Sequence, residues 1–224
     1  MALTLQNVAL GEQLADQLRS QIICGDITSG THLVEGTVAV EYGVSRGPVR
    51  DALRTLQGEG LLESRKQGYF TRAFAASDID ELYEIRSAAE HLACRLAIQR
   101  GGEDTWRTAQ LHIDAMRKFA DSGNAHGYAR ADVDFHTEFY VHSGNVRLLN
   151  LWQQFQPTFA TLMDITNAQD ADLHRSFRHH VDLLALAREG KAKEFDLLLS
   201  AHLERSRARM SRSQENPDWQ STAN

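Results

Sequence analysis

The sequence predicts a mainly α-helical protein in two parts, an N-terminal unit with a β-hairpin and an antiparallel all-α bundle of about six helices. Only 3 of the 224 residues are proline, and alanine, leucine, glutamate and arginine are abundant, which favours helices. Beyond residue 77, apolar residues recur at helical spacing in segments separated by short turn sequences. Nearer the N-terminus, two short apolar runs flank a basic tip, which predicts the hairpin.

The composition is ordinary for a globular protein, with 42% hydrophobic and 24% charged residues. No apolar run approaches the roughly 20 residues needed to span a bilayer, and no signal peptide is recognisable. Cys24 and Cys94 lack the spacing of a metal or redox motif and suit a reducing compartment. We therefore expect a cytoplasmic protein without a membrane segment.

The N-terminal unit starts with a helix over residues 8–25. This helix ends at Gly25, because glycine readily adopts the positive φ of a helix C-terminus. A turn is predicted at 26–30 and a short helix at 37–42. Gly43 then suits a tight turn into the next helix.

The next helix has an apolar face and an arginine face. Ser45 occupies its N-cap position, and we expect the hydroxyl to accept a backbone N–H. Pro48 falls in the first turn, where a missing N–H costs nothing. The apolar stripe consists of Val49, Leu53 and Leu56, and the arginines, each four residues apart, are Arg46, Arg50 and Arg54.

Two interpretations of this helix are open, a solvated surface helix and a helix that enters the major groove of DNA. The following segment favours the second, because strands at 61–64 and 68–71 enclose a basic tip that could meet phosphates. Residues 45–72 hold six Lys and Arg against three Asp and Glu, whereas the whole chain has a net charge of −6. The pattern predicts a winged helix-turn-helix within residues 1–75 that binds double-stranded DNA over a short footprint.

The second part is expected to span residues 76–212 as a helical domain, with residues 213–224 as a disordered tail. Long amphipathic helices joined by short loops are typical of an antiparallel bundle. Pro157 lies inside the fourth of these helices and should kink it. The six predicted helices cover about 78–99, 103–121, 124–143, 145–167, 170–189 and 191–212.

The bundle carries a candidate metal site. Asp132 and His136 are four residues apart and share one helix face. His180 and His202 lie on the apolar stripes of the fifth and sixth helices, where an unpartnered histidine is costly. Imidazole and carboxylate ligands suit Zn²⁺, Ni²⁺, Mn²⁺ or Fe²⁺, with zinc favoured, and a small carboxylate could fill open positions on the ion.

Ordinary structural roles compete with this interpretation. Each histidine could be a core residue bonded to a carbonyl or water, although the Asp132/His136 pair favours a site. Arg86, beside an apolar face, could clamp the carboxylate of an effector or could be a surface residue. The other histidines are expected to be surface or packing residues: His32, His91, His112, His126, His142, His174 and His179.

Several motifs together resemble a known family. They are the run VSRGPVRDAL over 44–53, Gly58 to Leu62, the Asp132-x-x-Phe135-His136 motif, Ser143 to Asn145, and His202-Leu203. With these residues the chain, over about 8–210, resembles the GntR family of bacterial transcription regulators. The resemblance is to the FadR-type branch with a C-terminal FCD effector domain. Six bundle helices look like the VanR-type subgroup.

The resemblance implies a homodimer that binds near-palindromic operators and responds to a small organic acid at a metal ion. Two positions depart from the family pattern. Gly36 stands where many relatives carry a DNA-contacting arginine, and Gly47 replaces the more usual threonine. The implied metal ligands are Asp132, His136, His180 and His202, and the candidate DNA-binding residues are Ser45, Arg46, Gly47, Arg50, Arg54, Lys66, Gln67 and Gly68.

The leading hypothesis is therefore a ligand-responsive transcriptional regulator, a repressor, without enzymatic activity. A metal-dependent enzyme and a metal sensor are the alternatives, since a His/Asp site with open positions could activate water. No inward Glu or Asp is clearly placed as a general base, and an enzyme would leave the winged head unexplained.

Overall fold

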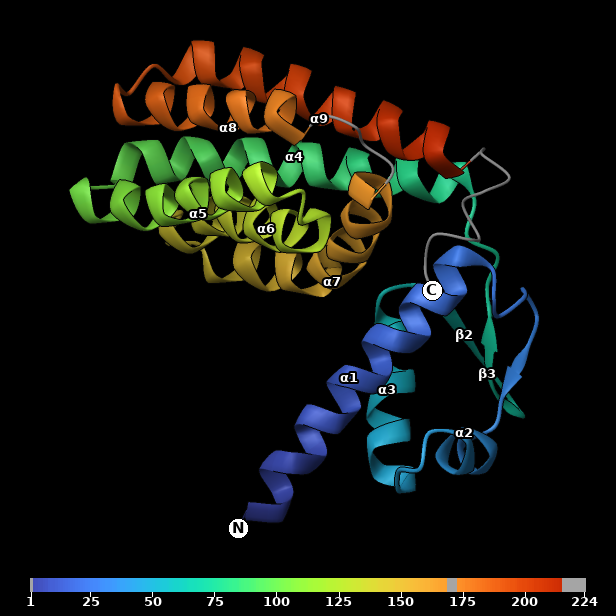
Figure 1. The fold of residues 1–224 in the computed structure, drawn as a ribbon. Helices are drawn as coiled ribbons and strands as arrows, with labels where there is room; N and C mark the ends of the chain where they lie inside the picture. The colour runs from blue at the N-terminus through green and yellow to red at the C-terminus, as the bar shows by residue number, and fades with distance from the viewer. Residues whose placement is uncertain (1, 169–172, 215–224) are drawn as a thin grey trace. The chain divides into compact units, whose positions relative to one another are not determined.

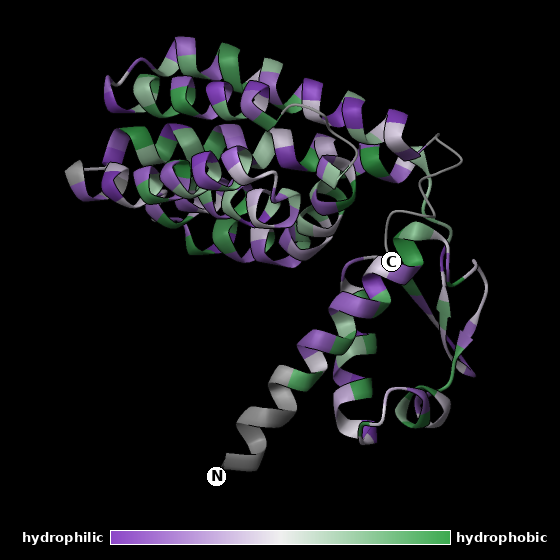
Figure 2. Cartoon of the chain, in the orientation of Figure 1, coloured by the Kyte–Doolittle hydropathy of each residue, from purple (hydrophilic) through white to green (hydrophobic). Residues whose placement is uncertain are grey.

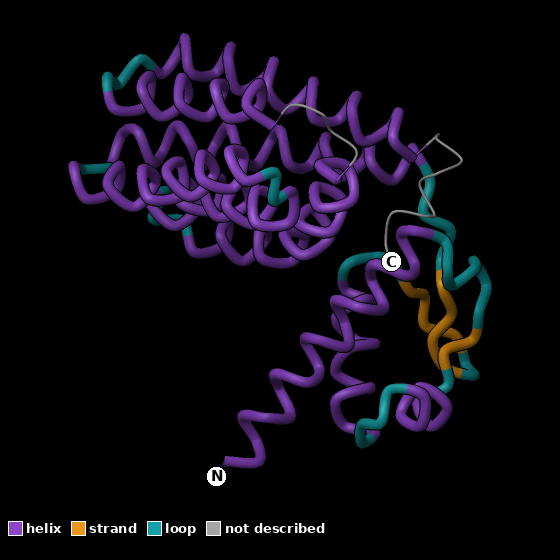
Figure 3. The backbone as a smooth tube through the Cα atoms, in the orientation of Figure 1, coloured by secondary structure: helices purple, strands orange, loops and turns teal. Residues whose placement is uncertain are grey.

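The computed structural model describes residues 2–168 and 173–214 and divides into two compact units, one ending at Ala75 and the other starting at Ala76 (Figure 1). Helices make up most of the described chain, and the strands are confined to the N-terminal unit (Figure 3). The predicted fold class is confirmed. No described helix combines the length and apolar character needed to cross a membrane.

The N-terminal unit contains three helices, α1 (Ala2–Cys24), α2 (Glu35–Glu41) and α3 (Arg46–Gly58). Helix α1 begins six residues before the predicted start and packs along α3. Gly43, which joins α2 to α3, has a φ of 65°, the positive value that was expected of it. The core between the helices is apolar and includes Leu18, Ile22, Val49, Leu53 and Leu56.

The sheet of this unit has three strands rather than the two predicted. Strands β2 (Leu62–Arg65) and β3 (Gly68–Thr71) form the expected antiparallel hairpin. Strand β1 (His32–Leu33) pairs with the other side of β3, in the order β1-β3-β2. Two residues carry too little periodicity to predict a strand, and the partners Phe70 and Tyr69 are far away in sequence.

A buried ion pair ties α1 to the end of α3. The guanidinium of Arg19 donates from Nε to Glu59 Oε2 at 2.6 Å and from Nη2 to Glu59 Oε1 at 2.7 Å. Both side chains are 2% exposed. Asp16 accepts a further hydrogen bond from Arg19, but its side chain is 71% exposed.

We expect Glu59→Gln to destabilise the N-terminal unit by about 3–5 kcal/mol, because it leaves the Arg19 charge buried without its counter-ion. Urea denaturation followed by circular dichroism measures the loss. Asp16→Asn is the matched control and should cost under about 1 kcal/mol, since that partner is exposed. Equal effects of the two substitutions would contradict the assignment of Glu59 as the essential partner.

The second unit is the helical bundle. Each helix starts and ends within three residues of the predicted positions, and α7 continues through Pro157. The last helix ends at Gln214, two residues inside the predicted tail, and residues 215–224 of that tail lie outside the described residues. The helices are α4 (Ala76–Arg100), α5 (Glu103–Ser122), α6 (Ala125–His142), α7 (Val146–Ala168), α8 (Leu173–Arg188) and α9 (Ala192–Gln214).

Helix α6 is the central element of the bundle, packed against α4, α5 and α7. Apolar and polar residues alternate along the helices around it, as expected of amphipathic elements (Figure 2). Helices α8 and α9 lie side by side, with α9 also against α4 and α8 against α5 (Figure 1). Residues that point inward from α4, α6, α8 and α9 therefore meet in one interior region.

Candidate metal centre and nucleic-acid interface

The arginine helix α3 has the two faces that its sequence predicts. Val49, Leu53 and Leu56 are fully buried, while Arg46 and Arg50 are exposed. Gly47 and Arg54 also lie on the exposed side. A rigid helix held by its apolar face thus presents its arginines and its first turn to a partner.

Ser45 stands at the N-cap of α3 with the extended backbone of that position, φ −76° and ψ 165°. The prediction that the Ser45 hydroxyl caps the helix was wrong, because no side-chain capping bond forms from Ser45 in the described structure. Ser45 is exposed, so water can satisfy the first backbone N–H groups of the helix. Its hydroxyl is then available to a phosphate oxygen.

Two of the arginines lie against residues of α2. Arg50 donates from Nε and Nη2 to the two carboxylate oxygens of Glu35 at 3.2 and 3.1 Å. This pair lowers the pKa of the Glu35 carboxyl. Gly36 lies against Arg46, and a Cβ atom added at Gly36 would be 3.5 Å from Arg46 Nη2. That distance is ordinary van der Waals contact, so a methyl group would fit at residue 36, whereas a longer side chain would compete with the Arg46 guanidinium for space.

The wing is the β2–β3 hairpin, and Lys66 and Gln67 are exposed at its tip. Gly68 follows with a φ of 127°, a conformation that side chains disfavour. His32, expected to have a surface or packing role, stacks on Phe70 with ring centroids 4.4 Å apart and bonds the Gln67 carbonyl from Nε2 at 2.9 Å. The third strand therefore braces the tip that was predicted to meet DNA.

The bundle brings three of the predicted metal ligands together. His136 comes from α6, His180 from α8 and His202 from α9, and one ring nitrogen from each lies within 4.8 Å of the others. All three are buried. Asp132, one turn before His136, borders the group with Oδ1 3.5 Å from His136 Nε2 and Oδ2 3.3 Å from His180 Nε2.

In two of the histidine rings, the hydrogen-bond partner of Nδ1 determines which nitrogen carries the proton. His136 Nδ1 donates to the Glu90 carboxylate, and His180 Nδ1 donates to the Ser176 carbonyl at 2.9 Å. In the neutral rings Nε2 therefore carries a lone pair directed toward Asp132. Burial lowers the pKa of His136, and it lowers the pKa of His202 well below its usual value, which favours neutral imidazoles.

In this arrangement hydrogen-bond acceptors face one another without a donor between them. Among the described residues, Asp132 Oδ1, His136 Nε2 and His180 Nε2 are buried and have no hydrogen-bond partner. Buried polar atoms left in this way are costly, and a divalent cation among them would satisfy all three at once. The residues present therefore fit a metal ion with mixed nitrogen and oxygen ligands.

Arg86 lies close to this centre on α4, buried rather than at the surface. Its Nε donates to Glu90 at 2.9 Å, whereas Nη1 and Nη2 have no partner in the described part of the chain. The rings of Tyr83, Trp152 and Phe159 surround the guanidinium at 5.0–5.6 Å. A permanent cation with two unsatisfied nitrogens in an aromatic enclosure is a strong recognition point for an anion.

Glu90 joins the arginine to the metal centre and was not among the predicted site residues. Burial alone would raise its pKa, but the interactions with His136 and Arg86, including the hydrogen bond that each donates to the carboxylate, outweigh burial and lower it to about 2. Its carboxylate thus orients the His136 ring. The signal in the sequence is weak, because an Arg and a Glu four residues apart also occur on any solvated helix face.

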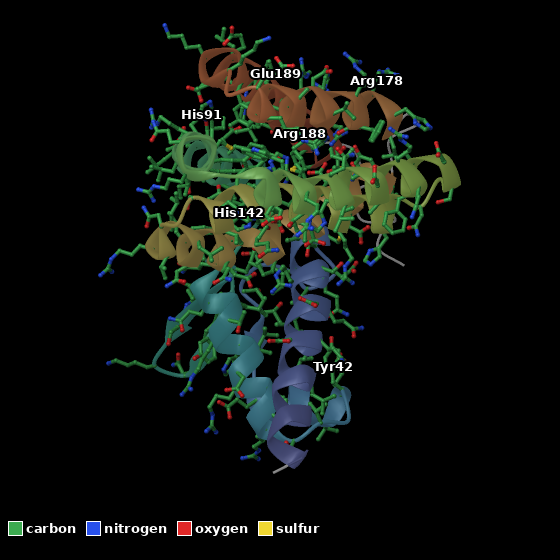
Figure 4. All side chains as sticks on the ribbon, turned by 90° about the vertical axis from the view of Figure 1, so that its left-hand side faces the viewer. Tyr42, His91, His142, Arg178, Arg188 and Glu189 are labelled. Atoms are coloured by element: carbon green, nitrogen blue, oxygen red, sulfur yellow. The ribbon has the colours of Figure 1, made fainter. Side chains whose placement is uncertain are left out.

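The remaining histidines of the bundle lie outside this cluster, as expected. His91 bonds Ser87 and Ser200, while His112 and His142, the latter labelled in Figure 4, both face Glu138. His126 pairs with Asp164. His179 is the exception, since it accepts a bond from Arg205 and lines a pocket beside the metal centre.

Two family models match the chain. The model described as "Bacterial regulatory proteins, gntR family" matches residues 10–70, and the model described as "FCD domain" matches residues 81–205. The first match covers the winged unit and the second covers the helices that carry all the candidate metal ligands.

Known proteins of similar sequence are regulators of transcription. The "Probable D-xylose utilization operon transcriptional repressor" of Paenarthrobacter nicotinovorans is 30% identical over 177 residues, 76% of this chain and 78% of that protein. The HTH-type regulator YdhC of Bacillus subtilis is 31% identical over 141 residues, 62% of this chain and 63% of that protein. The solved structure of McbR/YncC of Escherichia coli has the same fold, with a TM-score of 0.71 and 19% identity over 92% of this chain and 99% of that chain.

Proposed function

Because the chain belongs to the GntR family of bacterial regulatory proteins and carries an FCD domain, we propose that it is a repressor whose operator binding is controlled by a metal-bound organic acid. The family assignment makes it a DNA-binding transcriptional regulator and not an enzyme. The metal ion, the organic acid and their control of DNA binding are the proposed part.

The observation that carries the metal proposal is the convergence of buried acceptors at Asp132, His136 and His180. His202 completes the ligand set, its ring centroid 4.6 Å from that of His180. A bound Zn²⁺ would supply positive charge and a position that can accept a carboxylate oxygen. Because the four residues come from three helices, occupation of the site would also fix the relative positions of α6, α8 and α9.

The organic acid is proposed from the unsatisfied nitrogens of Arg86. A carboxylate near them would complete hydrogen bonds that the buried guanidinium lacks. The aromatic enclosure holds that cation in place without a second counter-ion. Arg86 thus acts as the proposed carboxylate clamp, and Glu90 fixes its orientation through the Nε hydrogen bond.

Control of DNA binding is proposed to act through a homodimer. Two copies would place two α3 helices at the half-sites of a near-palindromic operator. An effector that binds better to one arrangement of the bundle shifts the dimer toward it and so changes the affinity for the operator. Such a regulator works on the chromosome, in the cytoplasm.

The experiment that tests the function is a thermal-shift screen of small carboxylates with the full chain, loaded with Zn²⁺ or treated with a chelator. We expect at least one acid to raise the melting temperature in the presence of zinc, and the same acid to change operator affinity in an anisotropy titration. A ligand at 100 times its Kd stabilises by about 2.7 kcal/mol, a readily measured shift. Equal shifts with and without metal would refute the metal-bound effector.

Glu90→Gln is expected to weaken Zn²⁺ binding by about 10- to 100-fold, because the ring of His136 loses the carboxylate that orients it. Competition with a fluorescent zinc chelator measures the affinity, and circular dichroism verifies the fold. Glu84→Gln, at an exposed position of the same helix, is the control and should bind zinc like the wild type. A folded Glu90→Gln variant with unchanged zinc affinity would show that Glu90 does not support the site.

A further inference from the structure

A pocket of about 440 Å³ opens between α8 and α9 beside the candidate metal centre. Asp132 and His202, two of the proposed ligands, form part of its lining. A molecule in this pocket can therefore reach the metal position. The rest of the lining is dominated by four arginines, Arg175, Arg205, Arg209 and Arg212, and His179 also lines the pocket.

In the part of the chain that the structure describes, carboxylates do not balance the charges of Arg175, Arg205 and Arg212. Of the described residues that line it, Asp132 is the one carboxylate, and it is already directed at His136 and His180. No described carboxylate lies within ion-pair distance of Arg175, Arg205 or Arg212. By contrast, Arg207 of the same helix points elsewhere and pairs with Asp80 and Glu204.

Ordinary helix electrostatics explain only some of these arginines. Arg212 lies in the last turn of α9, where a cation interacts favourably with the helix dipole. Arg175 lies in the first turn of α8, where the same dipole disfavours a cation. The positive end of α8 and the arginines of α9 thus face one pocket, an arrangement that an anion stabilises and that solvation alone does not require.

We propose that this pocket recognises a second anionic group of the effector, so that the effector is an organic acid with at least two anionic groups. The proposal rests on the proposed metal-bound acid. One carboxylate of that acid occupies the metal centre, and a second carboxylate or a phosphate group meets the arginines of α8 and α9. Arginine suits both groups, because its planar fork donates two parallel hydrogen bonds to either. A monocarboxylate would leave Arg175, Arg205 and Arg212 without an anionic partner among the described residues.

The test compares matched probes on the zinc-loaded full chain by isothermal titration calorimetry. One series is acetate, succinate and citrate, and the other is gluconate against gluconate 6-phosphate. We expect a multiply charged member of at least one series to bind at least about tenfold more tightly than its monoanion, since one charged hydrogen bond contributes that much. Succinate or citrate identifies the second group as a carboxylate, and gluconate 6-phosphate identifies it as a phosphate.

The double variant Arg175→Gln/Arg205→Gln should reduce that gain in affinity to under about threefold and leave the affinity for the monoanion unchanged. Arg178→Gln is the matched control, because Arg178, labelled in Figure 4, is an exposed arginine of α8 outside the pocket. The control should retain the full gain. Both arginines replaced in the double variant are exposed, so the fold should be preserved.

Three results would overturn the proposal: monoanions that bind as tightly as the multiply charged probes, a double variant that keeps the gain, or no binding by any multiply charged probe. Zinc content and operator affinity are measured on the same samples. Failure of the proposed function would appear as a wild type without stoichiometric zinc. If the protein binds zinc and operator but any of these three results is obtained, the proposed second anionic group of the effector is refuted and the metal proposal is unaffected.

Discussion

Arg46→Ala is expected to abolish specific operator binding and to leave the fold intact. Arg46 is exposed at the first turn of α3, its guanidinium lies close to Gly36, and it is not part of the apolar core. Loss of one bidentate contact to a guanine edge costs about 1–3 kcal/mol, roughly a 5- to 150-fold loss of affinity. In the proposed homodimer the contact is lost at both half-sites, which doubles the loss of binding free energy.

The measurement is an anisotropy titration with an operator selected in vitro by the wild type, set against random DNA of the same length. The ratio of the two affinities should fall steeply, while the affinity for random DNA changes little. Arg72→Ala removes the same charge from the same unit outside the predicted interface and serves as the control. An unchanged ratio would contradict the assignment of α3 as the helix that recognises the operator sequence. A uniform loss on both DNAs with a smaller salt slope would assign Arg46 to phosphate instead.

His136→Ala/His202→Ala is expected to lower the bound metal from about one ion per chain to a trace. The variant removes two of the four proposed ligands, from α6 and α9. Removing one supporting residue of a metal site already costs about 10- to 100-fold in affinity, so the loss of two ligands should exceed that. Metal content after purification is determined by elemental analysis, and His136→Gln/His202→Gln repeats the test with less change in core volume.

The control is His126→Ala/His142→Ala, which removes two histidines that pair with carboxylates outside the cluster. Both positions bracket the same helix, α6, so the control also reports nonspecific effects on that helix. Its metal content should match the wild type. A folded His136→Ala/His202→Ala variant that still co-purifies with stoichiometric metal would refute the assigned ligands.

Local chemistry made most of the architecture predictable. The ends of the bundle helices, which follow from apolar stripes and turn sequences, were predicted within three residues, and two glycines at these turns, Gly144 and Gly190, have positive φ. The three inward histidines could be recognised because each interrupts an apolar stripe. These features depend on residues within two turns of one another, which a single sequence records directly.

The features that were missed depend on residues brought together by the fold. Strand β1 exists because its backbone meets β3, and nothing within His32 and Leu33 requires it. Glu90 is a site residue because the packing of α6 against α4 brings His136 next to it. The arginines of α8 and α9 form a pocket through the antiparallel packing of two helices, each of which resembles an ordinary charged surface helix when considered by itself.

The glycine at position 36 has a consequence for the evolution of this interface. Because the guanidinium of Arg46 lies close to Gly36, a side chain longer than that of alanine introduced there must share space with the residue proposed to read the operator. Substitutions at positions 36 and 46 are therefore epistatic, and their effects on binding will not add. Exchanging α3 alone therefore does not transfer the operator preference of a relative, because the residue at position 36 of α2 limits the rotamers that Arg46 can adopt.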